Sequence, residues 1–166
     1  VRLCDSGWNE ELASVFVRCK MMFVDRIKTA HWEPGAINCV FTDASGGYWG
    51  AIYTQVLHWD PTKEPHEQDH IPIAVASGAF KGSQLNWSTI EREAFPIVKC
   101  LSSWEHFLQS GSEVRVYTDH KNIADMFQPE RITPSLGKSQ IEKMYRWLYV
   151  MSFFKITQIR HIKGEY

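Results

Sequence analysis

The sequence predicts an α/β (mixed α+β) fold: a five-stranded mixed sheet, with three antiparallel strands followed by two parallel ones, flanked by helices. Three β-rich segments separated by turns occupy residues 36–79, and a long apolar stripe with helical spacing follows. A strand, a helix and a last strand complete the order, which is typical of a mixed sheet with helices on its faces. With 166 residues, 44% of them hydrophobic, the chain can bury one ordinary core and carry a short appendage.

The first 35 residues form the predicted appendage. Residues 9–32 have the apolar spacing of a helix, and the repeating positions are Leu12, Val15, Phe16, Cys19 and Phe23. Pro34 and Gly35 then interrupt the pattern strongly. We therefore interpret residues 1–35 as a helical piece with its linker, and residues 36–166 as the main domain.

Three antiparallel strands are predicted to open the main domain. The first spans residues 36–45 and the second residues 48–57, and Gly46-Gly47 between them indicates a tight hairpin. A polar loop rich in proline and histidine separates them from the third strand, residues 71–79.

Helical periodicity begins after the third strand. Ser88 and Glu91 have the spacing of a capping box, and the apolar stripe continues to about Leu108. Pro96 lies inside this helix and lacks a backbone donor, so a kink is expected there. The remaining predictions are a strand at 114–118, a short helix at 122–127, a helix at 136–151 and a strand at 153–162.

Three carboxylates stand where active sites of α/β sheets gather. Asp43 lies near the end of the first predicted strand, Asp119 just past the fourth, and Glu93 near the start of the long helix. If strands one and four are parallel neighbours, the two aspartates lie side by side. We choose Glu93 over Glu91, since Glu91 serves the capping box, while Glu93 lies about 60° from Ile90 on the flank of the apolar stripe.

This cluster favours a metal site. Clustered carboxylates repel one another unless a cation neutralises them, and hard oxygen ligands suit Mg²⁺ or Mn²⁺ rather than zinc. Two such ions would suit phosphodiester hydrolysis, one activating a water and the other stabilising the leaving oxygen. Each acid also has a structural explanation by itself: Asp43 as a turn residue, Asp119 as a helix cap and Glu93 as a surface acid.

Composition restricts the setting. No stretch has the ~20 apolar residues of a membrane span, and the four cysteines include no Cys-x-x-Cys pair, which favours reduced thiols inside a cell. From residue 115 onward nine Lys/Arg stand against five Asp/Glu. This basic third is either a backbone-binding surface for nucleic acid or an ordinary solvated helix face.

Five stretches together resemble, in order and spacing, the ribonuclease H domain of gypsy-type (LTR) retrotransposon reverse transcriptases. They are FTDASGGYWGAIYTQ, IPIAVASGAF, NWSTIEREAFPIV, VYTDHKNI and FKITQIRHIKGEY. The resemblance covers residue 37 to the end, and it implies that residues 1–35 are the tail of the polymerase thumb or connecting region. The metal-binding and catalytic carboxylates of that family carry over onto Asp43, Glu93 and Asp119.

The resemblance also implies a substrate, partners and a location. The substrate is an RNA–DNA hybrid whose RNA strand is cut with two Mg²⁺ (or Mn²⁺) ions, and backbone groups of Ala44, Ser45 and Gly46 are placed to recognise the 2′-OH that marks RNA. The partner is the polymerase domain of a parent polyprotein, with no membrane involved. The expected location is intracellular: cytoplasm, virus-like particle or nucleus.

Two features depart from the family's pattern. The family's fourth acidic ligand, an aspartate, would follow the HIKGEY stretch beyond Tyr166, so we expect weak activity from residues 36–166 alone, as a domain truncated at its C-terminus. Pro96 also replaces the usual leucine or alanine. The alternative hypotheses are a non-catalytic scaffold or binding module of a polyprotein, or of an element reused by a host, and another nuclease or transferase on the same fold.

Overall fold

The computed structural model describes residues 7–26, 30–108, 112–123, 127 and 137–162. The chain divides into two compact units, Val1–Ala30 and His31–Tyr166. The first unit contains helix α1 (Glu10–Arg26), which begins where the Asn9 side chain accepts the Leu12 amide at 2.8 Å. The predicted helix was too long, since residues 30–32 are not helical, and residues 27–29 lie outside the described part. The assignment of residues 1–35 to the tail of a polymerase thumb or connecting region stays a prediction.

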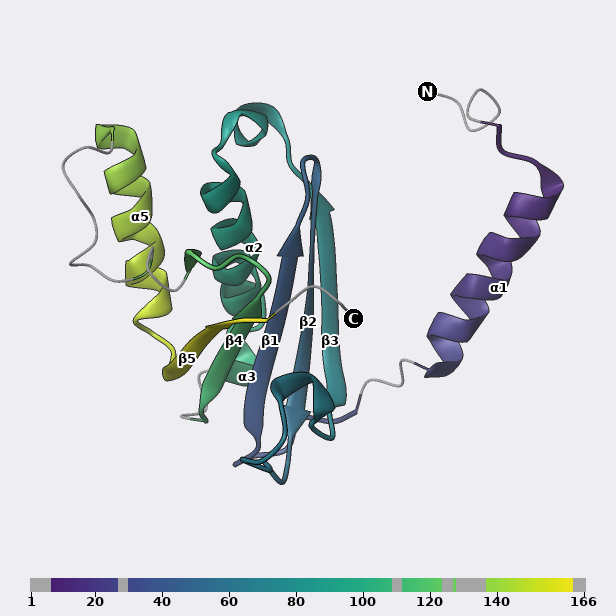
Figure 1. Ribbon diagram of the computed structural model, residues 1–166, viewed down its shortest axis with the longest axis horizontal. Coiled ribbons are helices and arrows are strands. Elements are labelled where there is room, and N and C mark those ends of the chain that lie inside the picture. Colours follow the sequence, from purple (N-terminus) through teal and green to yellow (C-terminus); the bar gives the residue numbers. More distant parts are fainter. Residues whose placement is uncertain (1–6, 27–29, 109–111, 124–126, 128–136, 163–166) are drawn as a thin grey trace. The chain divides into compact units, whose positions relative to one another are not determined.

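A five-stranded sheet organises the second unit (Figure 1). Its strands are β1 (Ile37–Ala44), β2 (Tyr48–Val56), β3 (Ile71–Ala79), β4 (Val114–Thr118) and β5 (Ile156–His161). The spatial order is β3-β2-β1-β4-β5. The β1–β2 and β2–β3 pairs are antiparallel, whereas β1–β4 and β4–β5 are parallel. The predicted fold class is confirmed.

Helices α2 (Thr89–Ser103) and α5 (Lys138–Met151) lie on the same side of the sheet (Figure 1). Short 3₁₀ helices span Pro65–Glu67 and Gly82–Asn86.

The prediction of one helix continuing to Leu108 was wrong, because α2 ends at Ser103 and a separate turn, α3 (Glu105–Leu108), follows. The break falls at Trp104, whose buried indole packs 5.6 Å from the Tyr53 ring. Helix α2 continues through Pro96, and the kink stays a prediction. Of the short helix predicted at 122–127, residues 124–126 lie outside the described part.

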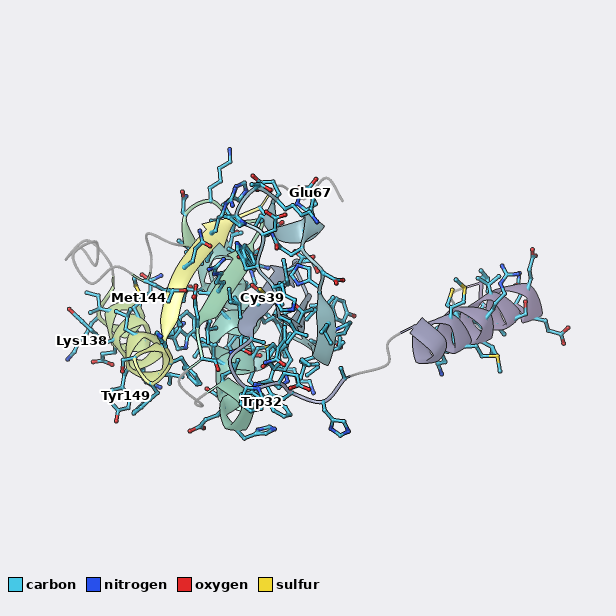
Figure 2. The ribbon with its side chains drawn as sticks, turned by 90° about the horizontal axis from the view of Figure 1, so that it is seen from below. Trp32, Cys39, Glu67, Lys138, Met144 and Tyr149 are labelled. Carbon is cyan, nitrogen blue, oxygen red and sulfur yellow. The ribbon has the colours of Figure 1, made fainter. Side chains whose placement is uncertain are left out.

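The main core fills the space between the sheet and the two long helices. Strand residues Val40 and Val116 pack there with Ile97 and Leu101 of α2 and Trp147 of α5. Alternate strand residues point to the opposite face, where Cys39, Val56 and Tyr117 form a smaller cluster. Along α5, Met144 is buried and Tyr149 is 66% exposed (both labelled in Figure 2). This packing fixes α2 on the sheet, and α2 carries Glu93.

Within the second unit, a buried amide side chain ties the segment before β1 to the sheet. The Gln55 side chain accepts the Glu33 amide at 2.8 Å and donates to the Glu33 carbonyl at 3.0 Å. The same Gln55 nitrogen donates to Asn38 Oδ1, which also accepts the Tyr53 hydroxyl at 2.7 Å. Gly35 follows with a φ of 87°, a left-handed conformation that glycine adopts without strain. The chain entering β1 is therefore held by the sheet.

Among the described residues, no helix has both the length and the apolar character that crossing a membrane requires.

Candidate active site

Parallel pairing of β1 and β4 brings two aspartates together. Thr42 of β1 is the register partner of Thr118 of β4, so Asp43 and Asp119 each come one residue after this pair of neighbouring positions. Asp43 still pairs with Gly50 of β2, whereas Asp119 follows the end of β4. Both aspartates are exposed. The sequence-based expectation that they lie side by side is met in the structure.

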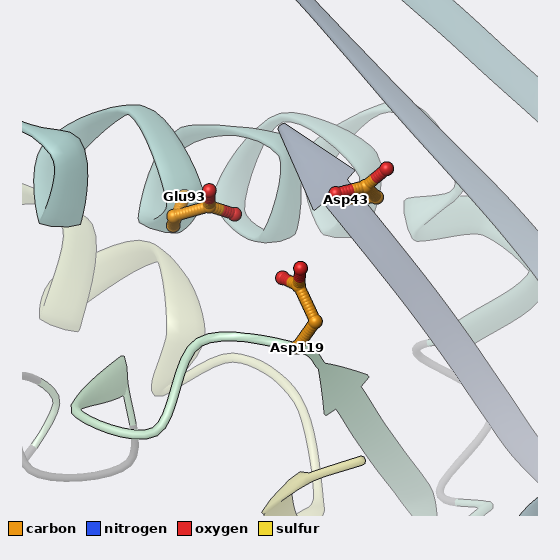
Figure 3. Close-up of side chains that lie close together, drawn as sticks. All are labelled: Asp43, Glu93 and Asp119. Atoms are coloured by element: carbon orange, nitrogen blue, oxygen red, sulfur yellow. The ribbon is translucent and has the colours of Figure 1, made fainter. Parts of the chain in front are cut away.

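Glu93 reaches the same place from the second turn of α2. The three side chains converge (Figure 3), and one carboxylate oxygen from each lies within 4.8 Å of the other two. Glu93 is only 7% exposed, and its Oε2 is buried with no hydrogen-bond partner among the described residues. A negative charge on this buried oxygen is energetically unfavourable unless a cation neutralises it or a proton binds to the carboxylate.

The electrostatic setting of Glu93 follows from that geometry. Burial, reinforced by the nearby charges of Asp119 and Asp43, raises the pKa of Glu93 to about 7. A hydrogen bond from the Ala44 backbone and the charge of Arg92 act in the opposite direction but do not prevail. In the metal-free cluster Glu93 therefore keeps its proton to a higher pH than an ordinary glutamate does.

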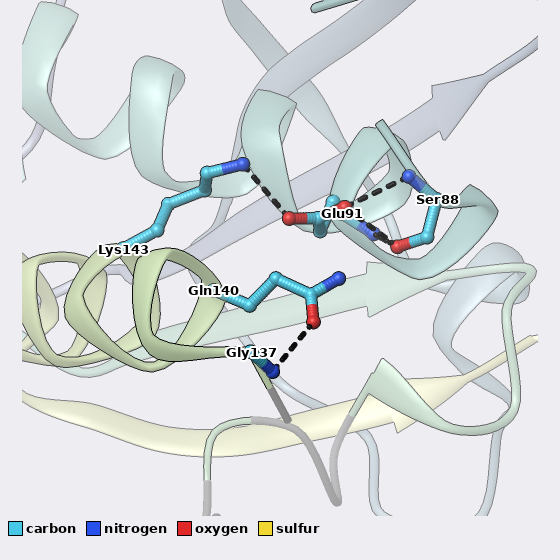
Figure 4. Close-up of polar contacts among 5 residues, drawn as sticks. All are labelled: Ser88, Glu91, Gly137, Gln140 and Lys143. Atoms are coloured by element: carbon cyan, nitrogen blue, oxygen red, sulfur yellow. Dashed lines mark hydrogen bonds and ion pairs between the residues drawn. The ribbon is translucent and has the colours of Figure 1, made fainter. Parts of the chain in front are cut away.

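Glu91, the alternative considered from the sequence, is outside this cluster. Its Oε2 accepts the Ser88 amide and the Ser88 hydroxyl, each at 2.8 Å, and its own amide donates to Ser88 Oγ at 3.4 Å. Its Oε1 accepts Lys143 Nζ of α5 at 2.8 Å (Figure 4). Burial would raise the pKa of Glu91, but the hydrogen bonds from Lys143 and Ser88 outweigh it and lower that pKa. The capping box was predicted from the sequence, whereas the partner on α5 was not.

Arg92 connects α2 to the turn between β1 and β2. Its Nη1 donates to the Gly46 carbonyl at 2.9 Å, across 46 residues of sequence. Within the turn, the Ser45 amide donates to the Tyr48 carbonyl at 2.8 Å. The Ser45 amide is thus engaged locally, while the Gly46 carbonyl keeps a second lone pair. Sequence reasoning missed Arg92, although its position next to Glu93 was a usable signal.

A surface pocket of about 580 Å³ opens beside the aspartates. Asp43 and Asp119 both line it, together with the apolar side chains of Phe41, Ile52 and Val75. It offers room for a ligand in direct reach of two of the three carboxylates.

The donor set fits a hard divalent cation. All three candidate ligands are carboxylates, which suit Mg²⁺ or Mn²⁺ better than softer metals. The unpartnered buried oxygen of Glu93 supplies an independent reason for a positive charge at this point. Within the described residues this is the one group of three or more potential ligands close enough to share an ion.

Comparison with known families decides the classification. The family model described as "RNase H-like domain found in reverse transcriptase" matches residues 33–154, most of the chain. The chain belongs to this family. The match includes all three carboxylates of the cluster, and the five-stranded sheet agrees with an RNase H-like fold.

Curated relatives of this RNase H-like domain are retrotransposon polyproteins. The Tf2-3 and Tf2-4 transposon polyproteins of Schizosaccharomyces pombe are each 30% identical over 149 residues, covering 88% of this chain. The chain spans about a tenth of the length of those relatives, since the match covers 10% of each.

Solved structures show the same fold at low sequence identity. The foamy viral protease-reverse transcriptase, solved in complex with an RNA/DNA hybrid, matches 95% of this chain and 20% of its own, with a TM-score of 0.60 and 16% identity. RNase H1 from the archaeon Halobacterium salinarum matches 77% of this chain and 86% of its own, with a TM-score of 0.52 and 12% identity. These structural matches show the fold, whereas the family model and the curated relatives show that the chain is an RNase H-like domain related to retrotransposon polyproteins.

Proposed function

We propose that this domain hydrolyses the RNA strand of RNA–DNA hybrids with two Mg²⁺ (or Mn²⁺) ions, and that Asp43, Glu93 and Asp119 bind those ions. The observation that carries the proposal is the convergence of three carboxylates within 4.8 Å, one of them buried with an unpartnered oxygen. Membership of the RNase H-like family supports this choice over other reactions that need a divalent cation.

The three carboxylates differ in their positions within the proposed site. Asp43 and Asp119 present exposed carboxylates beside the pocket, and Glu93 adds a ligand from the protected side. The bound cations would supply activation of the attacking water and charge stabilisation of the leaving oxygen. The protein would contribute a fixed arrangement of negative charge that holds the ions, and the bound ions would supply the positive charge that orients the scissile phosphate.

Recognition of RNA is assigned to the turn after β1. The Gly46 carbonyl can accept a hydrogen bond from a ribose 2′-OH while it still accepts Arg92. Ala44 and Ser45 hold this turn next to Asp43, so a ribose contacting it lies close to the carboxylates. DNA lacks the hydroxyl and would lose that contact.

The cellular setting follows from the same proposal. A domain of this kind acts on hybrids made by a polymerase, so its partner is the reverse transcriptase polymerase domain of the parent polyprotein. The foamy viral relative is a protease-reverse transcriptase, and the yeast relatives are polyproteins, which supports this context. The corresponding location is intracellular, in the cytoplasm, a virus-like particle or the nucleus.

Cleavage of a labelled hybrid tests the proposal, with Asp119→Asn as the informative variant. Loss of one of three ligands at nearly constant volume should reduce the cleavage rate at least ~100-fold and weaken Mg²⁺ binding measured by calorimetry. Lys99→Gln, which changes an exposed charge on α2, is the matched control. Undiminished hybrid cleavage by the Asp119→Asn protein would refute the proposal.

The unmodified chain tests the non-catalytic alternative. Hybrid binding with no cleavage over a wide range of Mg²⁺ and Mn²⁺ concentrations, even after the chain is extended past Tyr166 to supply the expected fourth acidic ligand, would support a scaffold or binding module. Cleavage of duplex DNA or duplex RNA at the rate of the hybrid would instead indicate another nuclease on this fold.

A further inference from the structure

Glu93 is held in the cluster against a repulsive force. Its carboxylate is buried beside two other acids, and like charges at this range push one another apart. Glu93 lies in the second turn of α2, directly after a first turn whose amides lack partners within the helix. Some contact outside the cluster must therefore fix the first turn of α2.

That contact is made by α5. Lys143 Nζ donates to Glu91 Oε1 at 2.8 Å, and the two side chains are 20% and 8% exposed. Glu91 in turn binds Ser88, the N-cap residue directly before the helix (Figure 4). These contacts therefore connect α5 to Glu91, which lies two residues before Glu93 on α2.

Aromatic packing fixes the lysine as well. Lys143 Nζ lies 4.3 Å from the centroid of the Trp87 ring, the residue just before Ser88. Trp87 contacts Trp147 of α5 edge to face at 5.8 Å and Phe95 of α2 at 5.4 Å. Trp147 is part of the buried core, so the turn of α5 that carries Lys143 is packed against that core.

We propose that Lys143 is a positioning residue for the metal-binding site: its ion pair with Glu91 ties the first turn of α2 to α5 and thereby keeps Glu93 beside Asp43 and Asp119. This inference rests on the proposed function for the identity of the ligand, but its structural part concerns the metal-free protein. The Arg92 bond to Gly46 holds the same turn from the other side, toward the sheet.

Amide hydrogen exchange without metal is the first test, using Lys143→Met. Methionine keeps an unbranched apolar side chain beside Trp87 but removes the charge. The amides of residues 92–95 should exchange at least tenfold faster, while those of Val40 and Val116 in the sheet keep their rates. Lys143→Arg should restore protection to within twofold. Lys138→Met, at an exposed position of the same helix, is the control. Unchanged exchange at residues 92–95 would overturn the inference.

Calorimetric titration with Mg²⁺ is the second test. Lys143→Met should weaken Mg²⁺ binding at least threefold and lower kcat for hybrid cleavage, with the KM for hybrid unchanged. Unchanged Mg²⁺ affinity in a folded Lys143→Met protein would also overturn the inference.

A double variant covers the case in which Lys143→Met alone does not fold because it strands the Glu91 charge. Glu91→Gln combined with Lys143→Met removes both charges and keeps a capping-box residue at position 91. Fast exchange at 92–95 in this protein supports the inference, and protection equal to that of the unmodified chain contradicts it. Glu93→Gln separates the two proposals: if it leaves Mg²⁺ affinity unchanged, the proposed metal site fails, whatever the exchange data show for Lys143.

Discussion

Glu93→Gln provides a quantitative test of the electrostatics of the carboxylate cluster. In the unfolded chain Glu93 has an ordinary pKa of 4.5, whereas burial and the two aspartates raise it to about 7 in the folded protein. A raised pKa means that the folded state binds the proton more tightly. The stabilisation is therefore complete below the unfolded pKa and is lost as pH rises through the folded one.

The size of the effect follows from the separation of those two pKa values. At about 1.4 kcal/mol per pKa unit, the metal-free protein should lose on the order of 3 kcal/mol of unfolding free energy between pH ~5 and pH ~8 through this group. Glutamine is neutral at every pH and has nearly the same shape. Glu93→Gln should therefore flatten the pH profile and leave the metal-free protein more stable than the unmodified chain at pH ~8.

Urea unfolding in the presence of a chelator, repeated across this pH range, measures the effect. The two proteins share every other ionisable group, so the difference between their profiles isolates Glu93. With Mg²⁺ in excess the order should reverse, since the cation stabilises the folded protein that binds it more tightly. Parallel profiles for the two proteins in chelator would refute the assignment of Glu93 to a buried, repulsive site.

Two further predictions concern the scaffold around the cluster. Gly78→Ala should destabilise the protein by about 1–3 kcal/mol, because a Cβ there would lie 2.8 Å from Trp49 Nε1. Gly50→Ala, with open space at its Cβ, should change the unfolding free energy little. Equal losses of stability for the two variants in urea unfolding would contradict this reasoning. Gln55→Ala should lower the free energy of unfolding by about 1–3 kcal/mol, because it removes the hydrogen-bond partner of the Glu33 backbone. The Glu33 amide hydrogen should also exchange faster with solvent. An unchanged exchange rate would argue against a role of Gln55 in holding this segment.

The strands and the aspartates were predictable because they depend on local patterns. Alternating apolar residues and the Gly46-Gly47 turn define the β1–β2 hairpin, and the order of elements leaves few arrangements of the sheet. Once β1 and β4 are parallel neighbours, Asp43 and Asp119 must lie at the same edge. Helical geometry then separates Glu93 from Glu91, because only one of them faces the sheet while the other closes the capping box.

The contacts that fix the cluster could not be predicted in the same way. Lys143 lies 52 residues from Glu91 and has no local signal, since an exposed lysine on a helix and one that pairs with a buried acid look alike in sequence. The break at Trp104 has the same origin. Its helical spacing continues the stripe, but packing of the indole against Tyr53 of β2 is a tertiary effect.

Placing three acids together restricts the rest of the fold. Their repulsion opposes the packing of α2 on the sheet, so the helix must be secured by groups that do no chemistry. Glu91 connects it to α5, and Arg92 connects it to the β1–β2 turn. These two residues directly precede Glu93, so the ligand cannot shift without disturbing both contacts. A substitution at Lys143 or Arg92 would then weaken metal binding by changing the position of α2, although neither residue is among the three ligands.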